Sequence, residues 1–147
     1  MMDCEAVGQS ASEYFTEGYL CSESVLMAVA KAAKIDSPLI PAMATAFGSG
    51  LARTNSTCGA LSGGIMALSL LGGRSMQSET YDKLYANVAL LKDNFHEKFA
   101  SHECSTLLGF SLSDSDAKDK FVAGDCRQCK CTHYVAFAAQ EVCRIVS

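Results

Sequence analysis

The sequence predicts an all-α protein, a compact helical bundle with short connections, and three observations support this. Apolar residues recur at helical spacing in one segment after another, as in Val25, Leu26 and Val29. No segment combines alternating apolar and polar residues with the turn residues of a hairpin. Hydrophobic residues make up 49% of the 147 residues and charged residues 19%, so the chain can bury a core. We therefore expect one helical domain over residues 1–147.

Residues typical of helix boundaries divide the chain. Gly18 and the pair Gly72-Gly73 are expected to end helices, and Ser78-Glu79 to begin the longest one. Gly48-Ser49-Gly50 is expected to be a flexible turn. The expected helices are residues 4–15, 23–34, 41–47, 58–71, 79–100, 105–108, 114–122 and 132–146. The longest helix carries an apolar stripe that we expect to be buried, formed by Tyr81, Leu84, Tyr85, Val88, Leu91, Phe95 and Phe99.

Charge and composition exclude several classes of function. The net charge is -4 and no basic tract occurs, so nucleic acid is not an expected partner. The uncharged stretch from Thr54 to Gly73 has an apolar core too short to cross a bilayer, so no membrane association is expected. Residues 1–5 contain neither a basic nor an apolar leader segment, so we expect a cytoplasmic protein. We interpret His96 and His102 as solvated.

Eight cysteines occur in the chain, and half of them stand where a helix is expected to start: Cys21, Cys58, Cys104 and Cys131. The first turn of a helix carries unpaired N–H groups and the positive end of the helix dipole, which ease the loss of a thiol proton. In a reducing compartment, a dense set of cysteines indicates metal binding or redox chemistry more often than a disulfide scaffold. We therefore expect these four sulfurs to converge on one site.

The segment that follows Cys58 is rich in glycine, a residue that costs a helix about 1 kcal/mol relative to alanine. Gly59 and Gly63 are four residues apart and share one face of the expected helix. Such a face permits a close backbone approach. The approach is either to a neighbouring helix or to a cofactor held at Cys58, and the sequence leaves both alternatives open.

A second cluster is the CxxC pair Cys126 and Cys129, followed by Cys131. CxxC spacing lets two sulfurs share a metal or form a disulfide, and the neighbouring Arg127 and Lys130 favour thiolates. Cys143 and His133 are further candidate ligands, although a histidine near a helix start is more often a surface residue. Cys4 and Cys143 are interpreted first as small buried apolar residues.

Four blocks of this sequence resemble the redox-active four-cysteine family whose signature is written C_GCAxxG_C_C, and the resemblance runs from Tyr19 to the C-terminus. Thr57 stands where the family name has glycine. Cys4, Cys126, Cys129 and Cys143 are additional to the four cysteines of the family, and either Cys131 or a member of the CxxC pair completes that set of four. The resemblance implies redox activity without naming a reaction or substrate. The blocks are residues 19–26, 47–63, 103–109 and 131–135.

The leading hypothesis is a redox-active cysteine protein that binds an iron–sulfur cluster or another thiophilic metal, for electron transfer or redox sensing. Gly59 and Gly63 would then approach the cofactor. One alternative is a metal-free thiol–disulfide oxidoreductase in which Cys58 and Cys21 are catalytic, and another is an interaction module with structural zinc. A redox partner protein fits the leading hypothesis; a homodimer is compatible with an apolar bundle, although no heptad seam predicts one. The expected metal ligands are Cys21, Cys58, Cys104 and Cys131.

Overall fold

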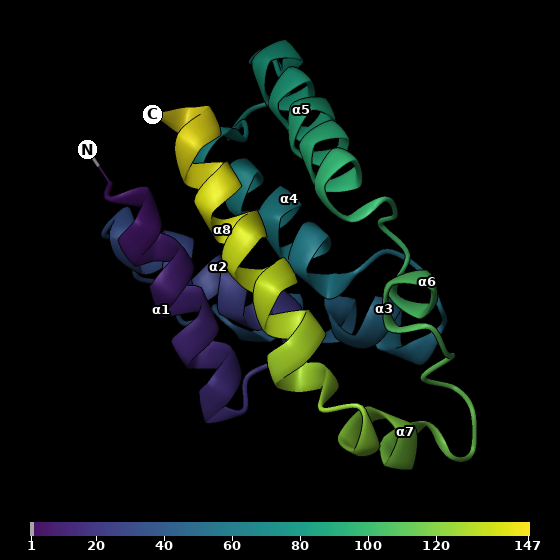
Figure 1. Ribbon diagram of the computed structural model, residues 1–147. Coiled ribbons are helices and arrows are strands. Elements are labelled where there is room, and N and C mark those ends of the chain that lie inside the picture. The colour runs from purple at the N-terminus through teal and green to yellow at the C-terminus, as the bar shows by residue number, and fades with distance from the viewer. Residues whose placement is uncertain (1) are drawn as a thin grey trace.

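Four helices form the packed centre of the protein: α1 (Cys4–Glu17), α2 (Cys21–Ala32), α4 (Gly59–Gly72) and α8 (Thr132–Val146). The computed structural model describes residues 2–147, and no strand occurs among them, which confirms the predicted all-α bundle. Figure 1 shows α1 running alongside α8, with α2 and α4 behind them. The side chains between these helices are almost entirely buried, and Val25, Val29, Leu61, Leu68, Val135 and Val142 are among them.

Local side-chain chemistry explains where the first two helices begin and end. The Asp3 carboxylate accepts hydrogen bonds from the N–H groups of Glu5 and Ala6 in the first turn of α1, and Gly18 ends that helix with a left-handed φ of 116°. Helix α2 begins at Cys21, two residues before its predicted start. The Glu23 carboxylate reaches back to the N–H of Leu20 at 2.8 Å and so stabilises this earlier beginning.

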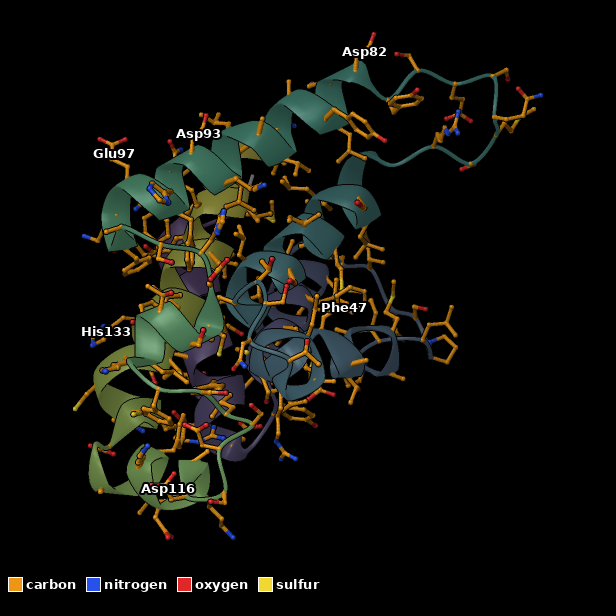
Figure 2. All side chains as sticks on the ribbon, turned by 90° about the vertical axis from the view of Figure 1, so that its right-hand side faces the viewer. Phe47, Asp82, Asp93, Glu97, Asp116 and His133 are labelled. Carbon is orange, nitrogen blue, oxygen red and sulfur yellow. A yellow bond between two sulfur atoms is a disulfide. The ribbon has the colours of Figure 1, made fainter. Side chains whose placement is uncertain are left out.

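Helix α5 (Asp82–Phe99) packs beside α4 and α8, most closely in its C-terminal half. Leu91 and Phe95 are fully buried, and Leu84, Val88 and Phe99 pack partly buried against the core. Tyr81 and Tyr85 are exposed, so the predicted buried stripe is correct except at its two tyrosines. Figure 2 shows the Asp82 end standing away from the bundle. The predicted start at Glu79 is wrong by three residues: the helix begins at Asp82, whose N–H donates to the Thr80 hydroxyl at 3.4 Å.

Short elements gather at the end of the bundle drawn lowest in Figure 1. They are η1 (Ala42–Phe47), α3 (Gly48–Arg53), α6 (Cys104–Leu108), α7 (Ala117–Ala123) and η2 (Arg127–Cys131). The segment predicted as a flexible turn is the left-handed α3, in which residues 49–53 all have φ between 55° and 66°. A left-handed turn costs an L-residue roughly 1–2 kcal/mol. The Thr54 hydroxyl, which donates to the Leu51 carbonyl at 2.6 Å, is one of the contacts that hold it.

The last helix is preceded by a π-helical turn that the sequence analysis did not predict. The N–H of Thr132 donates to the carbonyl of Arg127, five residues earlier, which is the hydrogen bond of a π-helix. The predicted bounds of α8 are correct, but the chain is already helical when it reaches Thr132. Cys131 therefore lies inside a continuous helical segment rather than at a helix start.

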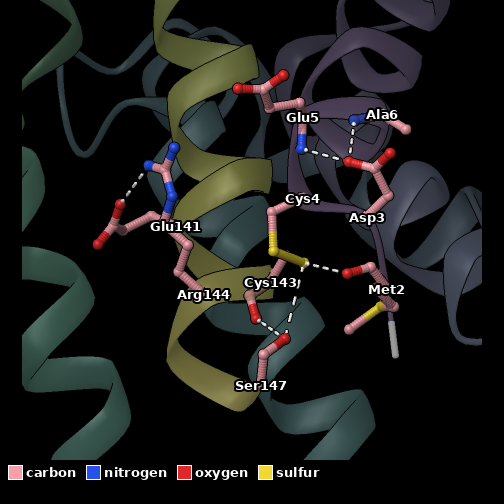
Figure 3. Close-up of a disulfide and its surroundings, with 9 residues drawn as sticks. All are labelled: Met2, Asp3, Cys4, Glu5, Ala6, Glu141, Cys143, Arg144 and Ser147. Atoms are coloured by element: carbon pink, nitrogen blue, oxygen red, sulfur yellow. Dashed lines mark hydrogen bonds and ion pairs between the residues drawn. A yellow bond between two sulfur atoms is a disulfide. The ribbon is translucent and has the colours of Figure 1, made fainter.

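Cys4 and Cys143 form a disulfide, with their Cα atoms 5.3 Å apart. Figure 3 shows this bond joining the first turn of α1 to the last turn of α8. The interpretation of these two residues as small apolar side chains is therefore wrong. The suggestion that Cys143 joins the CxxC pair is also wrong, because Cys143 is bonded at the far end of α8. Among the described residues, no helix is both long and apolar enough to cross a membrane.

Candidate functional site

A cavity of about 80 Å³ lies where α2, α4, α6 and the π-helical turn meet, and all four cysteines singled out by the sequence line it. Cys21 is the first residue of α2, and Cys58 immediately precedes α4. Cys104 is the first residue of α6, and Cys131 is the last residue of η2. Cys58 is only 5% exposed, and the other three are partly buried. Sulfurs from four separate segments thus face one enclosed space.

Backbone hydrogen bonds hold two of these segments together. The N–H of Cys58 donates to the carbonyl of His102 at 2.7 Å, and the N–H of Cys104 donates to the carbonyl of Ser56 at 2.9 Å. These two bonds flank an isolated antiparallel bridge between residues 57 and 103. A short extended pairing therefore fixes Cys58 and Cys104 relative to each other, although they are far apart in the sequence.

The two glycines that follow Cys58 have different roles. Gly59 borders the cavity, and a Cβ atom there would overlap the sulfur of Cys21. Gly63 packs on the backbone of α2, where a Cβ would lie 2.5 Å from the carbonyl oxygen of Ser22. Gly63 does not line the cavity. The close approach predicted from sequence is thus a contact with a cysteine at Gly59 and helix–helix packing at Gly63.

The left-handed turn α3 packs directly on the cysteine site. Backbone hydrogen bonds from Ser49 and Gly59 reach the sulfur of Cys21. A Cβ at Gly50 would lie 2.6 Å from the Cβ of Cys104, so only glycine fits at that position. Strained backbone persists where its surroundings hold it, and it concentrates at functional sites. The turn supplies the N–H of Ser49 to Cys21 and packs closely on Cys104 at Gly50.

Burial raises the pKa of every thiol that lines the cavity. The pKa of Cys58 lies well above its ordinary value of 9.0, first because of burial and then because of repulsion from Cys21 as a thiolate. The same two causes raise the pKa of Cys104 to about 11. The pKa of Cys131 rises to about 12, and that of Cys21 rises too. The expectation that helix starts ease the loss of these protons is wrong, because desolvation outweighs the backbone N–H groups.

The cavity wall also contains residues that were not expected from the sequence as site residues, and Phe15, Arg127 and Tyr134 are among them. The Arg127 guanidinium donates to the carbonyl of Phe15 and stacks over its ring, 4.1 Å from the ring centroid. The Tyr134 hydroxyl donates to the carbonyl of Leu107 at 3.2 Å. Burial, followed by the nearby thiols, raises the pKa of Tyr134 to about 12. Arg127 and Tyr134 lie close to Cys131 in sequence, but no sequence pattern brings Phe15 to it.

The remaining candidates lie outside the cavity wall. His133 is exposed, and Figure 2 shows it at the periphery of the molecule. Cys126 is buried and Cys129 is exposed. His96 is solvated as predicted, but His102 is partly buried, and its Nδ1 atom is enclosed without a hydrogen-bond partner among the described residues. Within residues 2–147, no three His, Cys, Asp or Glu side chains form a group that could hold a single metal ion.

The family model described as putative redox-active protein (C_GCAxxG_C_C) matches residues 19–145. The chain belongs to this family. The match includes all four cysteines of the cavity and the glycine-rich segment between them, and it leaves Cys4 outside. No curated protein and no solved structure matches the chain. The family description assigns redox activity to its members, and it names no reaction, substrate or cofactor.

Proposed function

We propose that this family member binds an iron–sulfur cluster at the four-cysteine cavity and uses it for electron transfer or redox sensing. The observation that carries the proposal is the cavity itself, a space lined by Cys21, Cys58, Cys104 and Cys131. Four thiolates are the usual ligand set of such clusters, and soft sulfur ligands select iron–sulfur clusters, zinc or copper(I) over hard cations. When bound, a cluster supplies one-electron chemistry.

The protein's own residues suit this ligand set. Backbone N–H groups of Ser49 and Gly59 reach the sulfur of Cys21, and hydrogen bonds to sulfur are one of the ways a protein sets the reduction potential of a cluster. Apolar side chains such as Phe15 and Leu107 line the same space and limit its contact with water. Arg127 brings a positive charge to the wall, which offsets negative charge on nearby sulfurs.

A multi-atom cluster accounts for this geometry better than a single zinc ion. Tetrahedral zinc requires four ligands at about 2.3 Å from one centre when all are sulfur. Here the four cysteines line a cavity of about 80 Å³, a space that a multi-atom cluster would fill, whereas a single ion would need all four sulfurs at one point. Cys58 also makes a poor free nucleophile, because it is buried and its pKa is raised well above 9.0. Metal-free attack by Cys58 is therefore the weaker candidate.

Anaerobic purification, followed by measurement of iron and acid-labile sulfide per chain, tests the proposal. We expect iron and sulfide in comparable amounts, with the visible absorption of a cluster, and we expect both to be lost in a Cys58→Ser variant. Cys129→Ser is the matched control, because Cys129 is exposed and does not line the cavity. Protein that contains neither element after purification, and takes up neither during reconstitution with ferrous iron and sulfide, would overturn the proposal. Zinc alone, with no redox change, would support the structural alternative instead.

A further inference from the structure

The CxxC pair Cys126 and Cys129 is not explained by the cavity, because neither residue lines it. The two thiols are free, and they differ sharply in environment: Cys126 is 2% exposed, whereas Cys129 is exposed. Thiol–disulfide exchange needs one accessible sulfur to meet the partner and a second one nearby to release it. This pair has that arrangement within a single turn of chain.

The backbone around the pair is irregular. Asp125, which directly precedes Cys126, has a left-handed φ of 47°, and the π-helical turn begins at residue 127. Residues three apart on a regular helix have Cβ atoms about 5–6 Å apart. A disulfide needs about 3.5–4.5 Å, so a regular helix would have to tighten to close the bond. Here the bond would close within one irregular turn, which suits an exchanging pair rather than a structural one.

The charged neighbours of Cys129 leave its thiol accessible. The ammonium group of Lys130 donates to the carbonyl of Leu108 at 2.7 Å, and the guanidinium of Arg127 is held against Phe15. The group facing the Cys129 sulfur is the Asp125 carboxylate, at 3.8 Å, which accepts the thiol hydrogen. The two cations expected beside this pair are therefore engaged elsewhere, and Asp125 is the side chain that contacts the Cys129 sulfur.

We propose that Cys126 and Cys129 form a second redox site, a dithiol that reduces disulfides of low-molecular-mass thiols. The Cys129 thiol loses its proton to water, and its sulfur attacks one sulfur of the external disulfide. The old S–S bond breaks, a mixed disulfide forms on Cys129, and the first thiolate leaves and takes up a proton from water. The Cys126 sulfur then loses its proton and attacks the Cys129 sulfur, and the second thiolate leaves and takes up that proton. Two electrons pass from the dithiol to the external disulfide, which becomes two thiols, and the protein keeps a Cys126–Cys129 disulfide.

The experiment uses the full chain with its Cys4–Cys143 bond intact, under anaerobic conditions, and bis(2-hydroxyethyl) disulfide as the probe. After an acid quench and alkylation, trypsin separates the three neighbouring cysteines, because it cleaves after Arg127 and Lys130. Cys126, Cys129 and Cys131 then lie on peptides 121–127, 128–130 and 131–144. The expected product is peptide 121–127 linked to peptide 128–130, with two thiols released from each probe molecule.

Two variants test the order of the steps. Cys126→Ser is expected to accumulate the mixed disulfide on peptide 128–130, whereas Cys129→Ser is expected to leave peptide 121–127 unoxidised by the probe. A dominant link between peptides 128–130 and 131–144, or a Cys129 that remains fully alkylated after exposure to the probe, would overturn the proposal.

This second site does not depend on the cluster, and the two proposals can fail separately. The double variant Cys126→Ser, Cys129→Ser is expected to retain the iron and sulfide of the unchanged protein. If the protein binds no iron but still forms the linked peptides, only the cluster proposal fails. If it binds the cluster but the pair does not react, only the second redox site fails.

Discussion

The two ends of the α1–α8 pair use sulfur in opposite ways. At one end, Cys4 and Cys143 are joined covalently and lock the two helices together. At the other end, Cys131 shares a cavity with cysteines from three other segments, and all of these thiols are free. The difference lies in the backbone. At the disulfide, two facing helix turns bring two sulfur atoms within bonding distance, whereas at the cavity four segments converge around a space. The role of a cysteine in this protein therefore follows from the number of segments that meet around it.

The cavity end has a noncovalent counterpart of the disulfide. Arg127 connects the chain preceding α8 to the end of α1 through the carbonyl and ring of Phe15. The helix pair is thus held by a covalent bond at one end and by a hydrogen bond with stacking at the other. Because Phe15 and Arg127 also line the cavity, the packing of α1 against α8 helps to set the shape of the site.

Removal of the disulfide is expected to have the largest effect on stability of the changes that compare the two ends of the α1–α8 pair. The double variant Cys4→Ser, Cys143→Ser opens a loop with a sequence separation of 139 residues, and we expect it to lower the free energy of unfolding by about 2–5 kcal/mol. Urea unfolding measures this loss. Iron and sulfide content should stay unchanged, because neither residue lines the cavity. An unaltered unfolding midpoint would show that this end contributes little to the fold.

The close contact at the cavity end can be tested by adding one methyl group at Gly59. Gly59→Ala places a Cβ against the sulfur of Cys21, and we expect a loss of about 1–3 kcal/mol in stability together with reduced iron loading. Gly72→Ala is the matched control at the far end of the same helix, where no atom lies within 4 Å of an added Cβ. It should be neutral or stabilise the protein by up to about 1 kcal/mol. Equal effects of the two substitutions on stability and iron content would contradict a close contact at Gly59.

Local patterns predicted much of the fold, because most helix ends depend on nearby residues. Gly18 ends α1 as expected, and the bounds of α8 match the apolar periodicity. Helix α5 was predicted three residues too long at its start, because Ser78 and Glu79 have the chemistry of a cap but lie in the preceding loop. The π-helical turn before α8 and the left-handed α3 could not be predicted. Contacts with the rest of the protein maintain both, against the backbone conformation that the local sequence favours.

The site was predictable in its residues but not in its electrostatics. The four cysteines could be selected because each lies beside helix-boundary residues or glycine. The direction of their pKa shifts could not be predicted, because desolvation depends on the whole set of surrounding side chains. The disulfide escaped prediction for a similar reason, since no local signal pairs Cys4 with a residue near the other end of the chain.

The smallest expected effect is a decrease in stability at alkaline pH, to which the cysteines at the cavity end contribute and the cysteines of the disulfide do not. Burial first, and then repulsion from neighbouring thiolates, raise the pKa of Cys131 to about 12 and that of Cys104 to about 11, from 9.0. The folded protein therefore keeps protons that the unfolded chain releases. This contribution to stability is fully present below pH 9.0 and is lost as the pH rises through the folded pKa values. The disulfide at the other end does not titrate.

We expect the metal-free protein, with its cavity thiols reduced and its disulfide intact, to lose about 1 kcal/mol at pH 10 through Cys131. Cys104 should contribute less, because it is more exposed to solvent. Urea unfolding at about pH 8 and about pH 10, compared between the unchanged protein and Cys131→Ser, measures this contribution together with the smaller effect of the Cys131 thiolate on the pKa values of Cys58 and Tyr134. The variant should show the smaller decrease. An equal decrease would mean that Cys131 titrates in the folded protein much as it does in the unfolded chain, and the cavity would then be wetter than its apolar lining indicates.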